Sequence, residues 1–466
     1  MVFSDLFFLF SFLPAFALCY LIGAWIDGRF LSSATERSQQ AKNLVLVIFS
    51  LIFYAWGEPV YVFLMFGCVV LNYLAGRGIG ALKGGARRWA LIAGLTGNLL
   101  ILGTFKYMGF LVATLGDIGI TVSAPTIALP IGISFYTFQS ISYLVDVYRG
   151  ESPMQRRFLN LLLYISMFPQ LIAGPIVRYG TVAHEICDRR VTASDLYDGI
   201  YRFLIGLGKK VIIANQLSEI SDQFLVNGLA DLSTTGSWIG VVAFTFQIYF
   251  DFSGYSDMAI GLGRCLGFHF NENFDHPYCC RSITEFWRRW HISLGSFFRD
   301  YVYIPMGGNR RHQPLNILVV WFLTGMWHGA SWNFIIWGVY FGVIVMLEKY
   351  TLLRIINAVP RVLLHVYSML LVIVGWGIFY FDDFQSMIHF FRSFFGIDGH
   401  FTDFISQSAL TDHFWLWVVA LVFCMPVRRW LPDHLLTRLT LSLVVLVLSV
   451  ALLVGATNNA FIYTRF

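Results

Sequence analysis

Long apolar runs recur from one end of this 466-residue chain to the other and constrain its fold more than any other feature. A helix needs about 20 apolar residues to cross the hydrocarbon core of a bilayer. Several runs are shorter, so we expect some to be tilted, re-entrant or merged with a neighbour. The runs are Leu6–Ile26, Asn43–Trp56, Val60–Leu74, Trp89–Phe105, Phe158–Val177, Ile317–Met326, Phe334–Leu347, Val362–Phe381, Phe414–Val427 and Leu439–Val454.

Composition assigns the whole chain to lipid rather than to water. Hydrophobic residues make up 57% of the sequence and charged residues only 13%, far from the balance of a soluble domain. No Ser- or Pro-rich linker and no fixed-period repeat divides the sequence. Because backbone groups in lipid must be paired within their own segment, we expect an all-α polytopic membrane protein with one membrane-embedded domain over residues 1–466.

Basic residues in short connections mark the cytoplasmic side of a membrane protein. The connection from Arg77 to Arg88 is rich in them, whereas the turn at residues 57–59 has none. We therefore expect Met1 to lie outside and the Arg77–Arg88 loop inside. No basic residue precedes Arg29, so the first run is expected to stay as an anchor rather than to be a cleaved signal peptide.

Charge and cysteine usage argue against several kinds of partner. The net charge of +5 comes from basic residues scattered in twos and threes, not from a stripe that would follow a nucleic acid. The seven cysteines show no CxxC pair and no metal-ligand spacing. We expect no nucleic acid, no metal and no tightly bound cofactor.

The densest polar cluster is the segment Glu285–Leu294, which reads EFWRRWHISL. If it forms one helix, Arg288 and His291 lie three residues apart and share a face. Such a helix suits the rim of a cavity, but a basic helix that only anchors to lipid head groups has the same pattern. Glu285 can pair with Arg288 or Arg289 in either case.

A second cluster, Trp327–His328–Gly329, lies between two apolar runs. A lone His in an apolar segment is most often a packing residue, but an ionisable group at bilayer depth is expensive and therefore a candidate for function. Histidine suits acyl transfer because it can take a proton from an attacking hydroxyl and return it to the leaving thiolate. The small Gly329, Ala330 and Ser331 would let backbone or substrate approach the imidazole.

Acidic and hydroxyl side chains interrupt an apolar run in the segment Tyr249–Asp257. They are expensive in lipid unless they meet partners, and Arg288, Arg289 or Arg299 are available. Structural ion pairing explains this pattern as well as direct contact with substrate does. Together with the two clusters above, the residues expected to bind substrate are Arg288, Arg289, Trp327, Tyr249, Asp251, Ser253 and Asp257.

Taken in order, the three segments resemble motifs of the membrane-bound O-acyltransferase family. The similarity is to its bacterial branch that acetylates exopolysaccharides such as alginate or cellulose. Further likeness lies in Met1–Ser4, Pro130–Phe135, Asp146–Gly150 and Ala173–Pro175. The likeness extends to about Lys349, beyond which only hydropathy agrees.

The resemblance implies a bundle of many helices around a central funnel, in the inner membrane of a bacterium. It implies that His328 is catalytic and that His291 is a second catalytic histidine. By the same resemblance, acetyl-CoA is the cytoplasmic donor, and the acetyl group reaches the polymer through a periplasmic acyltransferase partner of a polysaccharide synthesis complex. Direct transfer and an acyl-His intermediate both remain open.

Other functions also remain open from the sequence. A related enzyme would transfer D-alanine to a cell-wall polymer. A solute transporter would use the intramembrane His, Asp and Arg as a relay, although no internal repeat supports this. A scaffold for a polysaccharide synthase would leave His328 without a chemical role.

Overall fold

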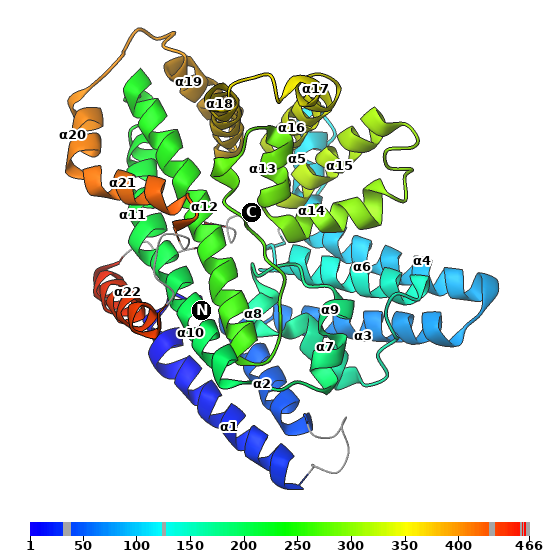
Figure 1. The fold of residues 1–466 in the computed structure, drawn as a ribbon. Coiled ribbons are helices and arrows are strands. Elements are labelled where there is room, and N and C mark those ends of the chain that lie inside the picture. The colour runs from blue at the N-terminus through cyan, green and yellow to red at the C-terminus, as the bar shows by residue number, and fades with distance from the viewer. Residues whose placement is uncertain (31–38, 124–126, 428–433, 457–458, 460, 463–466) are drawn as a thin grey trace. The chain divides into compact units, whose positions relative to one another are not determined.

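The structure is a computed structural model of the chain and describes residues 1–30, 39–123, 127–427, 434–456, 459 and 461–462. Within these ranges every regular element is helical (Figure 1). The chain divides into two compact units, unit 1 with Met1–Leu204 and Tyr255–Asn271, and unit 2 with Ile205–Gly254 and Glu272–Phe466. Each unit is described by itself, and the expectations of a single domain and of a central funnel stay predictions.

Seven helices of the described chain are long and apolar enough to cross a membrane. Each coincides with one of the apolar runs, and this confirms an all-α polytopic membrane protein. Large apolar side chains such as Phe10, Trp25 and Phe63 are more than half exposed on these helices, a surface that suits lipid rather than water. The spans are Phe8–Phe30, Gln40–Gly57, Tyr61–Ala81, Gly84–Asp117, Trp332–Ile355, Arg361–Tyr380 and Leu435–Gly455.

The remaining apolar runs form shorter helices. The run Phe158–Val177 breaks into α7 (Phe158–Ser166) and α8 (Phe168–Leu171), and Pro169 occupies the first turn of α8, where its missing N–H does no harm. The other two runs form α15 (Gln313–His328) and α21 (Phe414–Phe423). These helices are too short to cross a bilayer unaided.

Unit 1 is held together by buried aromatic and polar side chains. Phe3 stacks on Tyr255 with ring centroids 4.7 Å apart, and the side-chain amides of Asn72 and Asn98 exchange hydrogen bonds of 3.0 and 2.8 Å between neighbouring helices. Such polar pairs join helices inside a membrane. Its helices, besides α7 and α8, are α1 (Leu13–Phe30), α2 (Gln40–Gly57), α3 (Tyr61–Ala81), α4 (Gly84–Leu102), α5 (Met108–Asp117), α6 (Ile133–Arg149), α9 (Tyr179–Cys187) and most of α10 (Ala193–Gly208).

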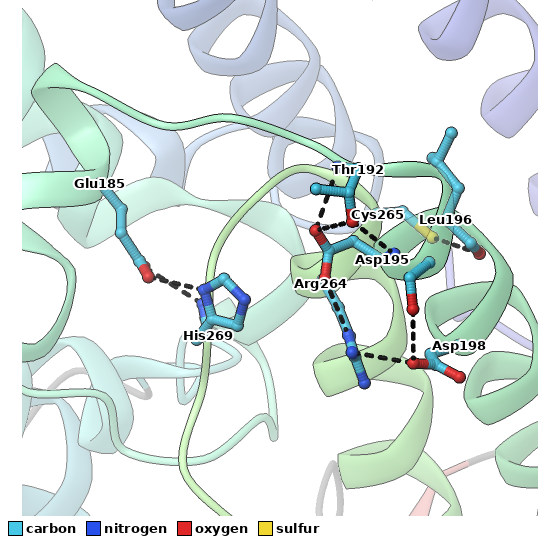
Figure 2. Close-up of polar contacts among 9 residues, drawn as sticks. Glu185, Thr192, Asp195, Leu196, Asp198, Arg264, Cys265 and His269 are labelled. Carbon is cyan, nitrogen blue, oxygen red and sulfur yellow. Dashed lines mark hydrogen bonds and ion pairs between the residues drawn. The ribbon is translucent and has the colours of Figure 1, made fainter.

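A polar network in unit 1 joins the start of α10 to the end of α12 (Thr234–Cys265), as Figure 2 shows. Arg264 lies 3.3 Å from Asp195 and 2.8 Å from Asp198. The Thr192 hydroxyl donates to Asp195, and this hydrogen bond holds the pKa of Asp195 at about 2. The groups satisfy one another, so we read this network as structural.

Unit 2 is built around a hairpin of α15 and α16 (Trp332–Tyr350). A Cβ at Gly325 would collide with the Phe334 carbonyl, and one at Gly338 with the Trp321 carbonyl, so these glycines let the two backbones approach closely. The other helices are α11 (Asn215–Asp222), α13 (Ile283–Arg289), α14 (Ile292–Phe298), α17 (Leu352–Ile355), α18 (Arg361–Tyr380), α19 (Phe384–Phe394), α20 (Phe404–Asp412), α21, α22 (Leu435–Gly455) and most of α12.

Candidate active site

His328 is the last residue of α15 and is only 4% exposed. Its ring centroid lies 5.0 Å from that of Trp327, 4.9 Å from Trp337 and 5.4 Å from Phe379. A side chain at Gly329 would collide with the ring of Phe334. The small residue after His328 therefore serves this packing, and the imidazole lies among aromatic rings, away from bulk water.

The segment Glu285–Leu294 is not one helix, contrary to the expectation from its spacing. α13 ends at Arg289 and α14 begins at Ile292. His291 lies at the break with a φ of 45°, in the left-handed region that non-glycine residues rarely adopt. The helical face that Arg288 and His291 were expected to share does not form, because a tertiary turn replaces the helix. Strained backbone of this kind concentrates at functional sites.

The hydrogen bonds of His291 define its tautomer. Its Nδ1 lies 3.1 Å from Oδ1 of Asn273, an atom that also accepts from the backbone N–H of Ser293 at 3.2 Å. An acceptor oxygen requires Nδ1 to carry the proton, so the lone pair is on Nε2. Burial lowers the pKa of His291, which lies outside the seven spans, to about 3. The imidazole is neutral at physiological pH.

Both histidines contact one tryptophan. The ring centroid of Trp327 is 5.6 Å from that of His291 and 5.0 Å from that of His328. The ring centroid of Phe252 in α12 lies 4.7 Å from that of His291. The structure thus brings the two predicted catalytic residues and Trp327 into one buried cluster.

A cavity of about 320 Å³ lies in unit 2 among α13, α14, α15 and α16. Lys349 donates to Asn309 at 2.9 Å, and Arg299 pairs with Asp300 at 2.6 Å. Within the described ranges Arg288 forms no ion pair. Cations and apolar walls together suit an anionic ligand with an organic portion. The lining residues are Thr284, Arg288, Gly295, Arg299, Tyr303, Asn309, Ile317, Val320, Trp321, Val345, Lys349 and Leu353.

Tryptophan rings connect this cavity to His328. Trp321 in the cavity wall lies 4.8 Å from Trp287, which lies 5.3 Å from Trp337. Trp337 in turn lies 4.9 Å from His328. The cavity and the histidine cluster are therefore ends of one continuous row of contacts.

Other predicted residues lie outside this row. Arg289 does not line the cavity but pairs with Glu285 at 2.6 Å, as one of the two expected pairings has it. Asp251 forms a buried ion pair with Lys210 at 2.6 Å and accepts the backbone N–H of Ile462 at 2.8 Å. The partner of Asp251 is thus Lys210, and not one of the arginines expected from the sequence.

The segment Tyr249–Asp257 is a continuous part of the 32-residue helix α12. Tyr249 and Ser253 are each 2% exposed, and the Tyr249 ring packs 5.2 Å from that of Tyr278. Asp257 belongs to unit 1, where it pairs with Arg202 at 2.8 Å. Both acids of the segment therefore form ion pairs, as the structural alternative expected.

Sequence reasoning missed several residues of the site. Asn273, which fixes the tautomer of His291, lies in an unremarked polar connection. Lys349 was named only as the end of the likeness, and Trp287 and Trp337 read as ordinary members of apolar or amphipathic segments. The one available signal was the unusual number of tryptophans between residues 287 and 337.

The chain is similar to one family model and to several named proteins. The model of the membrane-bound O-acyltransferase family matches residues 153–425, which contain both histidines and the cavity. The chain is 43% identical over 400 residues to the probable alginate O-acetylase AlgI of Pseudomonas aeruginosa, covering 83% of this chain and 73% of that protein. It is 32% identical over 444 residues to the peptidoglycan O-acetyltransferase of Helicobacter pylori, covering 88% and 82%. It is 29% identical over 230 residues to the teichoic acid D-alanyltransferase of Bacillus subtilis, covering 46% and 58%. The chain therefore belongs to the membrane-bound O-acyltransferase family, and its chemistry is O-acyl transfer.

Proposed function

We propose that this enzyme transfers an acetyl group from a cytoplasmic thioester, acetyl-CoA, for the O-acetylation of an exopolysaccharide outside the inner membrane. The observation that carries the proposal is the row of side chains from the cationic cavity through three tryptophans to buried His328. Relatives named for O-acetylation of alginate and of peptidoglycan match most of both chains, and they support acetyl as the group and a glycan as its destination.

The cavity lies at the basic end of the α15–α16 hairpin. Arg310 and Arg311 precede α15, Lys349 closes α16, and Arg354 and Arg361 follow. Basic residues concentrate on the cytoplasmic side, where acyl thioesters are made. Arg288, Arg299 and Lys349 would then meet the phosphates of the donor as it enters.

His328 would act as general base at the inner end of this row. It takes the proton of the acceptor hydroxyl while the oxygen attacks the carbonyl carbon of the thioester. The new C–O bond forms, the C–S bond breaks, and His328 returns the proton to the thiolate. Acceptor ester and free thiol are the products.

His291 would contribute through its neutral Nε2, which accepts hydrogen bonds. It can hold a donor amide N–H or the acceptor hydroxyl. Stabilisation of the oxyanion by His291 does not fit this tautomer, because Nδ1–H is directed to Asn273 and Nε2 carries no proton. We assign His291 to positioning.

Single-turnover transfer from labelled acetyl-CoA by purified enzyme tests these roles. His328→Ala should lose about 10²–10⁴-fold in rate and keep donor binding, since a general base acts on the chemical step. His291→Ala should instead raise the donor concentration needed more than His328→Ala does. Full turnover by His328→Ala would exclude it as the base, and equal rate losses with intact binding in both variants would show one catalytic unit.

The acceptor is proposed to be a periplasmic acyltransferase partner that passes the acetyl group to the polymer. Label recovered on a co-purifying protein before it appears on glycan would support this relay, whereas label appearing on glycan alone would argue for direct transfer. A D-alanyl thioester offered in place of acetyl-CoA tests the alternative suggested by the D-alanyltransferase relative, which matches less than half of the chain.

A further inference from the structure

Two buried indole N–H groups in unit 2 have no acceptor among the residues that the structure describes. They belong to Trp287 and Trp337. An indole N–H can only donate, and a buried donor without an acceptor destabilises a fold. Two other tryptophans of the unit have acceptors: Trp376 donates to the Tyr278 hydroxyl at 3.2 Å, and Trp238 to the Phe394 carbonyl at 3.2 Å.

The two unpaired donors lie at consecutive positions between the cavity and His328. The Trp287 ring contacts cavity residue Trp321 at 4.8 Å, and the Trp287 and Trp337 rings meet edge to face at 5.3 Å. Trp337 is fully buried and its ring lies 4.9 Å from that of His328. A ligand that reaches from the cationic cavity to His328 would have to pass these rings.

We propose that the indole N–H groups of Trp337 and Trp287 bind carbonyl oxygens of the acyl donor, and this inference rests on the proposed acyl transfer. Trp337, beside His328, takes the carbonyl of the thioester. Trp287, nearer the cavity, takes an amide carbonyl in the arm that joins the thioester to the phosphates. Amide and thioester carbonyl oxygens only accept hydrogen bonds, and the two indole N–H groups only donate them, so the two kinds of group are complementary.

The proposal also supplies a donor that the histidines lack. When the acceptor oxygen attacks, the thioester carbonyl oxygen becomes an oxyanion and needs an N–H aimed at it. His291 presents a lone pair at Nε2, and His328 is engaged with the moving proton. The N–H of Trp337 fills this role inside a site walled by aromatic rings, where a fixed dipole is most effective.

Phenylalanine substitutions remove the N–H and keep an aromatic ring. Binding is measured with acetyl-CoA and with S-ethyl-CoA, a thioether of the same length that lacks the carbonyl. The native enzyme should prefer acetyl-CoA. Trp337→Phe should abolish this preference and slow single-turnover transfer about 10²–10³-fold, as loss of one oxyanion donor does. Trp287→Phe should weaken both probes equally, by about threefold to tenfold, with little change in the chemical step.

Trp376→Phe is the matched control, because Trp376 belongs to the same aromatic cluster but already has an acceptor. It should keep both the preference and the rate. Unchanged preference in Trp337→Phe, or an equal loss in Trp376→Phe, would overturn the inference. If the Phe variant does not fold, benzothienylalanine at position 337 keeps the indole shape with sulfur in place of N–H. A native enzyme inactive with acetyl-CoA would instead overturn the proposed function.

Discussion

His291 combines a left-handed backbone, nearly complete burial and a neutral imidazole. Its pKa of about 3 lies below the ordinary value of about 6.5 that the unfolded chain would show. Between these pH values the unfolded state binds a proton that the native state does not. The contribution of neutral His291 to the free energy of unfolding is therefore fully present above about pH 6.5, and it is lost as the pH drops toward 3. Thermal unfolding in detergent between pH 8 and pH 4 should show a steeper loss for the native protein than for His291→Gln, and parallel curves would contradict this.

Arg288 and Arg289 are neighbours of equal charge in different surroundings. Arg288 lines the cavity, whereas Arg289 pairs with Glu285. We expect Arg288→Gln to raise the donor concentration for half-maximal transfer about tenfold, because it removes a charge-assisted contact to phosphate. In the matched variant Arg289→Gln, this donor concentration should stay within about twofold of the native value, because the ion pair of Arg289 is partly exposed. Initial rates of transfer over a range of acetyl-CoA concentrations provide the test. Equal effects of the two substitutions would show that the cavity does not bind the donor.

α13 is too short to be stable by itself, and its first N–H groups are capped both by Ser282, which accepts from the Glu285 N–H at 3.0 Å, and by a spanning helix. The carboxylate of Glu348 in α16, only 1% exposed, accepts from the backbone N–H of Ile283 at 2.6 Å and of Thr284 at 2.7 Å. The same carboxylate accepts a hydrogen bond from the Thr284 hydroxyl at 2.7 Å. This cap holds one wall of the cavity, with Arg288, against another that carries Lys349.

Glu348→Ala should leave these donors unpaired, and each donor that stays buried should lower the free energy of unfolding by about 1–3 kcal/mol. We expect a lower unfolding temperature and weaker donor binding together. Glu285→Ala, in the same helix, removes partly exposed contacts: ion pairs with Arg281 and Arg289 and a hydrogen bond from the exposed backbone N–H of Arg281. It should change the unfolding free energy by less than about 1 kcal/mol. Thermal unfolding and donor titration of both variants provide the test, and a stable Glu348→Ala enzyme with native affinity would show that the cap is dispensable.

Orientation in the membrane follows from the turns between the spanning helices. α3 ends at Ala81 and α4 begins at Gly84, so Lys83 lies in a short turn with Arg87 and Arg88 close behind it. A reporter fused after Lys83 should be active only in the cytoplasm, and one fused at Glu58, between α2 and α3, only in the periplasm. The reverse pattern would contradict the predicted orientation, in which Met1 lies outside and the Arg77–Arg88 loop inside.

The spanning helices could be predicted from sequence because the free energy of placing a run in lipid depends on its own residues and length. The seven spans accordingly match apolar runs. The family could also be predicted from the sequence, because each of its motifs is a continuous stretch of the chain. Trp327 and His328 were named from neighbouring letters, and the family match includes them.

The environment of each candidate was decided only by tertiary packing. A spacing of three suggested that Arg288 and His291 share a helix face, but Asn273, distant along the chain, holds His291 in a left-handed turn. The hydropathy pattern could not predict that Asp251 pairs with Lys210 rather than with an arginine, because an ion pair depends on the distance between the two groups in the folded chain. Likewise, whether an indole N–H has an acceptor depends on what surrounds the ring once the helices pack, and no pattern of local spacing contains that information.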